Sequence, residues 1–303
     1  MNFADRLDAA VIGAENPCLL GIDPHPGMLP EPYTVVTDRN VPREARANAM
    51  ADFCCELVDI AAGKVAAVKP QSAFFELLGA DGVFAWERVV EHARESGLLV
   101  IGDVKRADIA STAEAYAHAF LNTDPRHSCD AITVQPYLGS DTLEPFVEVC
   151  DQSDGGMYLL VRTSNPGSDA FQHHGTPPLF ERVASELERL GSSRVGKSGY
   201  APLGAVVGAT KRAELARCRE LMPHAPFLLP GYGAQGAGAE DVVDAFPDPA
   251  HPFRGGLVNS SRGIAFAYRK PEHKNRTWKE AAAHALDEMI DDLRRALTTR
   301  GQA

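Results

Sequence analysis

Eight short, apolar, β-rich runs recur along the chain, separated by amphipathic or irregular segments. The runs cover residues 18–23, 65–70, 98–105, 131–137, 157–164, 203–210, 227–233 and 256–263. Their nearly continuous apolar character indicates parallel strands buried on both faces, and most segments between them have the spacing of amphipathic helices. Eight such units in 303 residues favour an α/β protein with a (β/α)8 TIM barrel over a doubly wound sheet. We therefore predict a single barrel domain over residues 1–303.

Two insertions rich in Pro and Gly interrupt this rhythm, one after the first run and one after the fifth. They cover residues 24–42 and 165–178. Long irregular loops inside a compact domain are often lids or binding loops, and both would follow strand ends on the face where barrel active sites lie. After the eighth run, a capping box from Thr277 to Glu280 predicts a C-terminal helix that packs on the outside of the barrel.

The composition narrows the possible partners. The formal net charge is −11, and no block of Lys and Arg stands out, which argues against binding to duplex nucleic acid. No apolar run reaches the ~18 residues of a transmembrane helix, and the first residues lack the basic start of a signal peptide. We expect a soluble, cytoplasmic protein with no membrane partner.

Cysteine and histidine spacing gives no sign of a metal site. The six cysteines lie in apolar segments without CxxC spacing, so we interpret them as reduced core residues, including the adjacent Cys54 and Cys55. The ten histidines form no HExxH or Cys/His ligand pattern. We predict no metal.

Charged side chains gather at the predicted carboxyl ends of three strands. Asp23 ends the first run, Lys69 ends the second, and Asp103 and Lys105 end the third, with Asp108 just beyond. Residues two apart on an extended strand point to the same side, so Asp103 and Lys105 should lie together. A lone DxKxxD is more often a solvated loop. The presence of Lys69 at the end of the neighbouring strand argues against a solvated loop. It favours a single cluster in which two lysines and two aspartates alternate.

A glycine-rich segment after the seventh run indicates a phosphate site. Residues 231–236 carry GxGxxG between a predicted strand and a predicted helix, as a dinucleotide-binding loop would. Such a loop needs an acidic residue at the end of the next strand, and that strand ends in NSSRG. Barrels commonly hold a phosphate at their seventh and eighth units. We therefore favour a single phosphate, with Gln235 donating from the loop and Arg262 gripping through its planar guanidinium.

The ordered set of motifs resembles one enzyme family. DVKRAD after an apolar strand, a lysine ending the preceding strand, VQPYLG, TSNPG, PGYGAQG and SSRG resemble the orotidine 5'-phosphate decarboxylases, in particular their longer bacterial form. The resemblance spans nearly the entire chain. It implies a (β/α)8 barrel, usually dimeric, that converts orotidine monophosphate to uridine monophosphate in pyrimidine biosynthesis, without a metal or organic cofactor.

The same resemblance implies roles for the charged residues. Lys69, Asp103, Lys105 and Asp108 would form a charged tetrad in which Lys105 donates the proton. Asp108, with Thr112 close behind it, would reach into the site of the partner subunit of a homodimer.

Substrate-binding roles follow from the resemblance as well. Asp23 would bind the ribose hydroxyls, Ser164 the pyrimidine, and Gln235 and Arg262 the phosphate. It assigns no contacts to individual residues of the two long loops.

Two other functions remain open at this point. Sugar-phosphate decarboxylases and aldolases of the wider superfamily share DxKxxD but use a metal ion, held partly by an acidic residue where this chain has Lys69; a lysine there opposes a divalent cation. A non-catalytic binder of phosphate or nucleotide on a barrel scaffold is the other alternative. Such a binder would not need two lysines and two aspartates at one place.

Overall fold

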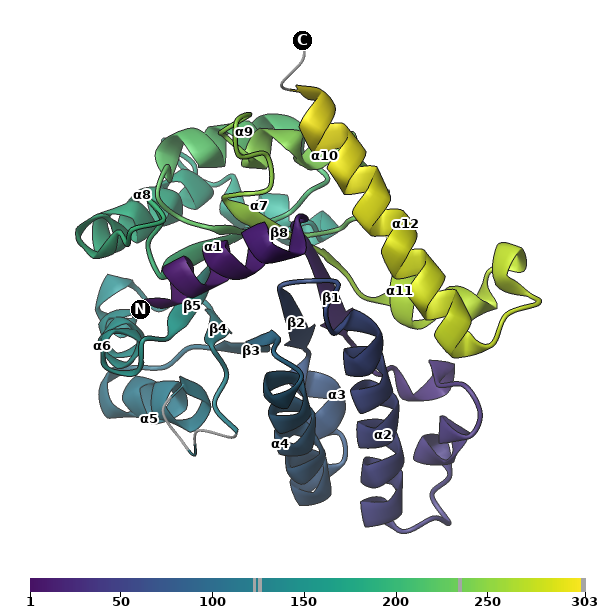
Figure 1. The fold of residues 1–303 in the computed structure, drawn as a ribbon. Helices are drawn as coiled ribbons and strands as arrows, with labels where there is room; N and C mark the ends of the chain where they lie inside the picture. The colour runs from purple at the N-terminus through teal and green to yellow at the C-terminus, as the bar shows by residue number, and fades with distance from the viewer. Residues whose placement is uncertain (122–123, 125–126, 234–235, 301–303) are drawn as a thin grey trace.

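Eight parallel strands form a closed barrel in chain order, from β1 to β8 (Figure 1). The computed structural model describes residues 1–121, 124, 127–233 and 236–300. The strands are β1 (Cys18–Ile22), β2 (Ala67–Pro70), β3 (Leu99–Arg106), β4 (Ala131–Val134), β5 (Gly156–Arg162), β6 (Leu203–Val207), β7 (Phe227–Pro230) and β8 (Gly256–Ser260). The ring closes where β1 pairs with β8, with Cys18 opposite Val258. The predicted TIM barrel is confirmed, and each predicted run contains or overlaps one strand.

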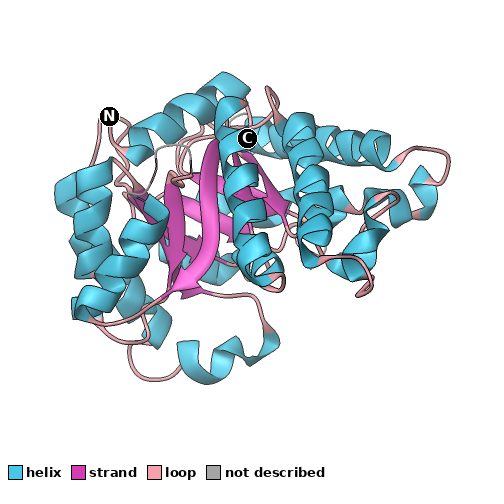
Figure 2. Cartoon of the chain, turned by 90° about the horizontal axis from the view of Figure 1, so that it is seen from below, coloured by secondary structure: helices cyan, strands magenta, loops and turns pink. Residues whose placement is uncertain are grey.

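Helices surround the barrel on its outside (Figure 2). The α-helices are α1 (Phe3–Ala14), α2 (Arg43–Ala61), α3 (Ser72–Glu76), α4 (Gly79–Glu95), α5 (Ala110–Leu121), α6 (Glu144–Ser153), α7 (Asp169–Gln172), α8 (Leu179–Gly191), α9 (Arg212–Leu221), α10 (Ala239–Val242), α11 (Arg262–Ala265) and α12 (Trp278–Thr299). The long helix α12 begins at the predicted capping box, in which the Thr277 and Glu280 side chains each bond the other residue's backbone N–H. The predicted C-terminal helix is therefore confirmed.

The first helix, α1, was not predicted from the sequence, and it lies across one end of the barrel (Figure 1). Its Phe3, Leu7 and Val11 are buried in a cluster with inward-facing strand residues such as Ile101 and Tyr158. Alternate residues of each strand face outward and pack under the surrounding helices in a second, larger cluster. The barrel therefore has an interior core that α1 closes at the amino-terminal ends of the strands.

Small residues make room for this closure. A Cβ added to Gly156 would lie 2.2 Å from the ring of Phe3, and one added to Gly204 would lie 2.5 Å from the ring of Tyr158. The two rings meet edge to face with centroids 6.0 Å apart. Glycines on β5 and β6 thus allow two large aromatic rings to share the narrow barrel interior.

The two insertions lie where the sequence places them, after β1 and after β5. The first carries the 3-10 helices η1 (Pro26–Met28) and η2 (Tyr33–Thr37), and the second carries η4 (Pro166–Ser168) followed by α7. Both are thus built from short helical turns.

All six cysteines are buried and unbonded to one another. Within the described ranges, we find no helix that combines the length and apolar character needed to cross a membrane.

Candidate active site

A cavity of about 500 Å³ opens at the carboxyl ends of the strands. Its walls combine charged and polar side chains with a few apolar residues of the barrel interior, such as Leu160 and Val206. Six of the nine residues that we predicted as functional line it: Asp23, Lys69, Asp103, Lys105, Ser164 and Arg262. This is the end of the barrel at which TIM-barrel active sites lie.

Asp103 on β3 is the centre of the charged set. Its Oδ2 accepts hydrogen bonds from Lys69 Nζ at 2.7 Å and from Gln71 Nε2 at 2.9 Å. Its Oδ1 accepts from Lys105 Nζ at 2.5 Å and from Thr133 Oγ1 at 2.9 Å. Four donors use the acceptor sites of one carboxylate, so Asp103 is held ionised in a single orientation.

Electrostatics at this carboxylate follow from burial and from the two lysines. Burial by itself would raise the pKa of Asp103, but the ammonium groups of Lys69 and Lys105 outweigh it and lower the pKa well below its usual range. Burial alone would lower the pKa of Lys69, yet Asp103 and then Asp23 raise it above its ordinary value. Both ions of the Lys69–Asp103 pair are therefore charged at neutral pH.

Lys105 reaches Asp103 through an irregular backbone rather than a regular strand. Its φ is 44°, in the left-handed region, and the pairing of β3 with β4 shifts register between Gly102 and Arg106. The backbone N–H of Lys105 donates to Thr133 Oγ1 at 2.9 Å, which holds this turn in place. The prediction that Asp103 and Lys105 lie together is confirmed, but a bulge rather than strand alternation places the lysine.

Two buried acceptors at the cavity wall are left for a ligand. Asp23 Oδ1 lies 4.0 Å from Lys69 Nζ, and both Asp23 Oδ1 and Asn259 Oδ1 are buried without a hydrogen-bond partner among the described residues. A buried oxygen without a partner costs free energy, so both are suited to accept from ligand hydroxyl groups.

The expected phosphate region lies at the ends of β7 and β8. Arg262 begins α11 and lines the cavity beside Gly231 and Ser261. Gly231, Gly233 and Gly236 have φ values of 113°, 70° and 91°, which residues with a Cβ rarely adopt. Backbone geometry thus explains the three glycines of the GxGxxG motif. Gln235 lies outside the described residues, so its predicted role stays a prediction.

Asp108 and Thr112 lie apart from this cavity. Asp108 follows β3 and accepts a hydrogen bond from the backbone N–H of Ile109 at 2.8 Å, while Thr112 is exposed on α5. Neither residue is among those that line the cavity. Within one chain, the structure therefore brings together three of the four predicted tetrad residues.

The sequence analysis missed several residues that line the cavity: Gln71, Thr133, Asn165, Gln172 and Asn259. Thr133 could have been found, because it lies two positions before Gln135, a polar residue within the fourth predicted run, and so faces the same side. Gln172 could not, because it comes from the short helix α7 within a segment that the sequence marks only as a loop.

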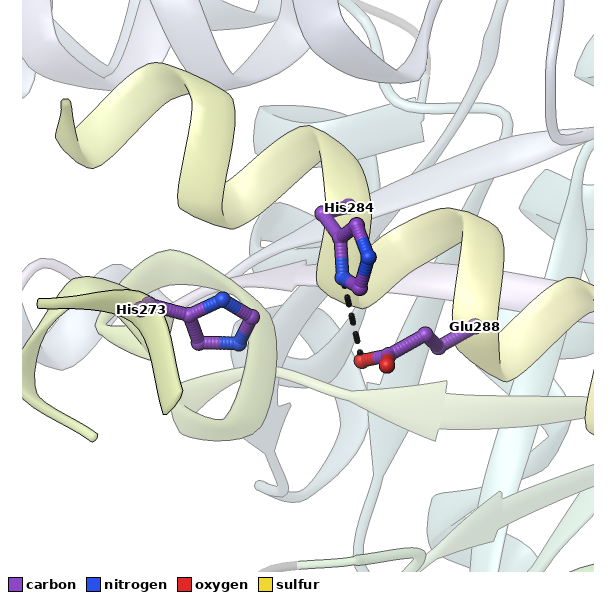
Figure 3. A group of neighbouring side chains, drawn as sticks. All are labelled: His273, His284 and Glu288. Atoms are coloured by element: carbon purple, nitrogen blue, oxygen red, sulfur yellow. Dashed lines mark ion pairs between the residues drawn. The ribbon is translucent and has the colours of Figure 1, made fainter. Parts of the chain in front are cut away.

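Three side chains on the outside of the barrel resemble a metal site (Figure 3). The ligand atoms of His273, His284 and Glu288 lie within 4.8 Å of one another, and His284 Nδ1 is 3.4 Å from Glu288 Oε2. However, Arg276 Nη1 lies 2.8 Å from His273 Nδ1. A guanidinium can only donate, so Nδ1 accepts and the proton of His273 is on Nε2. In this form Nε2 carries a hydrogen and has no lone pair for a metal ion, and we assign no metal to the cluster.

Comparisons with known proteins agree with the geometry of the cavity. A family model described as "Orotidine 5'-phosphate decarboxylase / HUMPS family" matches residues 37–277. A protein of Rhodopirellula baltica named orotidine 5'-phosphate decarboxylase is 42% identical and covers 97% of this chain and 99% of its own. One of the same name from Clostridium novyi is 36% identical over 96% and 98% of the two chains.

A solved structure extends the likeness to three dimensions. The OMP decarboxylase of Leishmania donovani is 32% identical, covers 98% of this chain and all of its own, and superposes with a TM-score of 0.73. Sequence and fold are thus similar over the whole barrel. The chain belongs to the orotidine 5'-phosphate decarboxylase family.

Proposed function

We propose that this protein decarboxylates orotidine 5'-monophosphate to uridine 5'-monophosphate, a step of pyrimidine biosynthesis, with the cavity at the carboxyl ends of the strands as its active site. Membership of the family supports the reaction. The observation that carries the proposal is the bonding of one buried carboxylate, Asp103, to the ammonium groups of both Lys69 and Lys105.

Lys105 is the proposed catalytic acid. When the bond between the ring carbon and the carboxylate breaks, carbon dioxide leaves and the electron pair stays on the ring carbon in an in-plane orbital. The ring π system cannot absorb that pair directly, so a fixed positive charge beside the carbon is needed. The ammonium of Lys105 provides this charge, and its proton then forms the new C–H bond. Its side chain is 43% exposed towards the cavity, which leaves it accessible to substrate.

One ammonium is not sufficient by itself. At about 4 Å and an effective dielectric constant near 20, it contributes about 4 kcal/mol, whereas enzymatic accelerations require about 8–23 kcal/mol. The rest comes from preorganisation. Asp103 and Lys69 hold Lys105 in place before substrate binds, and the negative charge of Asp103 lies close to where the substrate carboxylate must sit.

The rest of the cavity binds the nucleotide. Asp23 accepts from ribose hydroxyls through its partnerless oxygen, and Ser164 contacts the pyrimidine. Arg262, with Gln235, binds the phosphate. Binding energy from the phosphate and ribose is thereby used to press the ring against the charged set. We propose that the reaction requires no metal or organic cofactor, because the ammonium of Lys105 supplies both the positive charge and the proton.

The active form is proposed to be a homodimer in which Asp108 and Thr112 complete the site of the partner subunit. The position of both residues supports this, because Asp108 follows β3 and Thr112 lies near the start of α5, yet neither lines the cavity of its own chain. Asp108 would then be the fourth charge of the tetrad, supplied across the interface. A variant D108N should lose turnover while its own chain keeps the Lys69–Asp103–Lys105 contacts.

The decisive experiment follows the ultraviolet absorbance of orotidine monophosphate mixed with the purified protein, with and without a strong chelator. Loss of the orotate band at the same rate in both samples is the expected result. An unchanged band would contradict the proposed reaction, and a loss that the chelator prevents would contradict a metal-free mechanism.

A further inference from the structure

The loop after β5 is built around one buried guanidinium, that of Arg162. Arg162 ends β5 and is only 1% exposed. Its Nε donates to Glu214, its Nη2 donates to Asp169, and its Nη1 donates to Ser168 Oγ at 2.7 Å. No mechanistic step above uses this residue, and it is not among the described residues that line the cavity.

The same guanidinium fixes the orientation of the Gln172 side-chain amide, that is, which side carries the oxygen and which the nitrogen. Gln172 Oε1 accepts from Arg162 Nη1 at 2.9 Å and from the backbone N–H of Thr163 at 2.9 Å. Both of these groups can only donate, so a reversed amide would place its NH2 group against two donors. Gln172 Nε2 is therefore the side that donates, and it donates to Thr163 Oγ1 at 2.8 Å.

The polarity continues along the loop to Asn165. Because Thr163 Oγ1 accepts from Gln172, its own hydrogen is available, and it donates to Asn165 Oδ1 at 2.7 Å. The acceptor side of the Asn165 amide is thus occupied, and the side left over is the Nδ2 donor. Thr163, Asn165 and Gln172 all line the cavity. This wall therefore offers amide N–H donors to a ligand: the second hydrogen on Gln172 Nε2 and the Nδ2 group of Asn165.

We infer that Gln172 and Asn165 present these donors to carbonyl oxygens of the pyrimidine ring, and that Arg162 is the positioning residue that sets their polarity. The inference rests on the proposed function and adds a basis for base specificity. Ser164, the proposed pyrimidine contact, lies in the chain between Thr163 and Asn165, which places the ring against this wall.

Two amide donors of fixed orientation discriminate between bases. A uracil-type ring carries carbonyl oxygens at positions 2 and 4, whereas cytosine carries an amino group at position 4. The amino group would face a fixed N–H donor, leaving two donors opposed and both unpaired. Sites built to hydrogen-bond one ligand group reject analogues that lack it far more strongly than apolar pockets do. The loop therefore selects uracil-type over cytosine-type nucleotides.

The test compares binding of uridine monophosphate and cytidine monophosphate by titration calorimetry in wild type and R162K. We expect wild type to prefer the uridine nucleotide by about tenfold or more. R162K keeps the charge but cannot hold Glu214, Asp169 and Gln172 together, so most of that preference should disappear. Wild-type preference in R162K, or equal affinity in wild type, would overturn the inference.

R219K is the matched control. Arg219 is also buried, and its guanidinium donates to the backbone carbonyl groups of Met222, Ala225, Ala245 and Gly255. R219K should lower the melting temperature as R162K does, but it should leave the nucleotide preference unchanged. A loss of preference in both variants would make Arg162 a merely structural residue.

A second variant decides the matter if R162K does not fold. Q172E keeps the acceptor that faces Arg162 and replaces the Nε2 donor with an oxygen, so the preference for uridine monophosphate should fall about tenfold or more. Gln152 is exposed on α6, and Q152E is its control. A Q172E protein with wild-type preference would refute the role of Gln172.

Because binding is measured without turnover, the two claims fail separately. A wild type that prefers uridine monophosphate but leaves orotidine monophosphate unchanged would contradict only the proposed reaction. A wild type that decarboxylates but binds both nucleotides equally would contradict only the inferred role of the loop.

Discussion

The two ends of the barrel are built from the same strands, but one is apolar and closed and the other is charged and open. At the amino-terminal end, Phe3 of α1 packs on Tyr158, and the interior is apolar and closed. At the carboxyl-terminal end, β2 and β3 place Lys69 and Asp103 in an open cavity, where four hydrogen bonds replace apolar packing around one carboxylate. One end therefore stabilises the fold, and the other uses that stability to hold ions in place.

This contrast predicts that substitutions at the two ends separate activity from stability. The largest effect on activity is expected for K105A. Loss of the roughly 4 kcal/mol contributed by this ammonium should reduce turnover about a thousandfold or more. Stability should change little, because the Lys105 side chain is 43% exposed.

The control for K105A is K64A. Lys64 is a lysine of similar exposure, 37%, and pairs with Asp287 on the outside of the barrel. Turnover of orotidine monophosphate and thermal unfolding are measured for both variants. Turnover in K105A within tenfold of wild type would contradict its role as proton donor.

Removing the central carboxylate should affect both activity and stability. In D103N, two ammonium groups lose their buried partner, which costs about 3–5 kcal/mol of unfolding free energy. D130N makes a useful comparison, because Asp130 is also buried but accepts from Arg6 at 2.5 Å just before β4, at the other end of the barrel. We expect chemical denaturation to show a loss in both variants and activity assays to show a loss in D103N alone.

The pH dependence sharpens the comparison between the ends. The folded pKa of Asp103 is lowered by Lys69 and Lys105, so its ionised form contributes stability above the unfolded pKa of about 4. That contribution is lost as the pH falls from about 4 towards the folded pKa. The stability difference between wild type and D103N should therefore shrink below about pH 4. A difference that stays constant between pH 7 and pH 3 would contradict this account.

At the closed end, F3A should reduce stability without changing the chemistry. Phe3 is fully buried, and deleting such a ring costs about 3 kcal/mol or somewhat more, at the low end because a terminal helix can relax over the gap. F84A, at a phenylalanine that is 71% exposed, is the control. The denaturant midpoint should fall in F3A alone, with the KM for orotidine monophosphate unchanged. A raised KM would show that the two ends are coupled.

The sequence predicted the open end better than the closed one. Lys69, Asp103 and Lys105 could be assigned because opposite charges end two neighbouring apolar strands, which a solvated loop does not explain, and because the motifs around them resemble a known family. Helix α1 escaped prediction because its short apolar stripe resembles any surface helix, and only the closed barrel creates an interior for Phe3 to fill. The bulge at Lys105 also escaped, because strand alternation predicts the same neighbour without it.

The sequence also did not predict the direction of hydrogen bonding in the loop after β5. It depends on three consecutive hydrogen bonds: Arg162 donates to Gln172, Gln172 donates to Thr163, and Thr163 donates to Asn165. Each is an ordinary contact, and only their common direction has a functional meaning. Sequence spacing does not encode such a direction, since Arg162 and Gln172 are ten residues apart on different elements.

The smallest predicted effect concerns the interior of the closed end. Burial raises the pKa of Tyr158, and its hydroxyl is buried without a hydrogen-bond partner among the described residues. Removing an unpaired buried hydroxyl relieves its desolvation cost, so Y158F should be neutral or more stable by about 1 kcal/mol. Turnover should not change, and chemical denaturation measures the difference against wild type. A clear loss of stability in Y158F would mean that the hydroxyl has a partner at this end, and that the barrel interior is not closed to polar groups as the packing of Phe3 indicates.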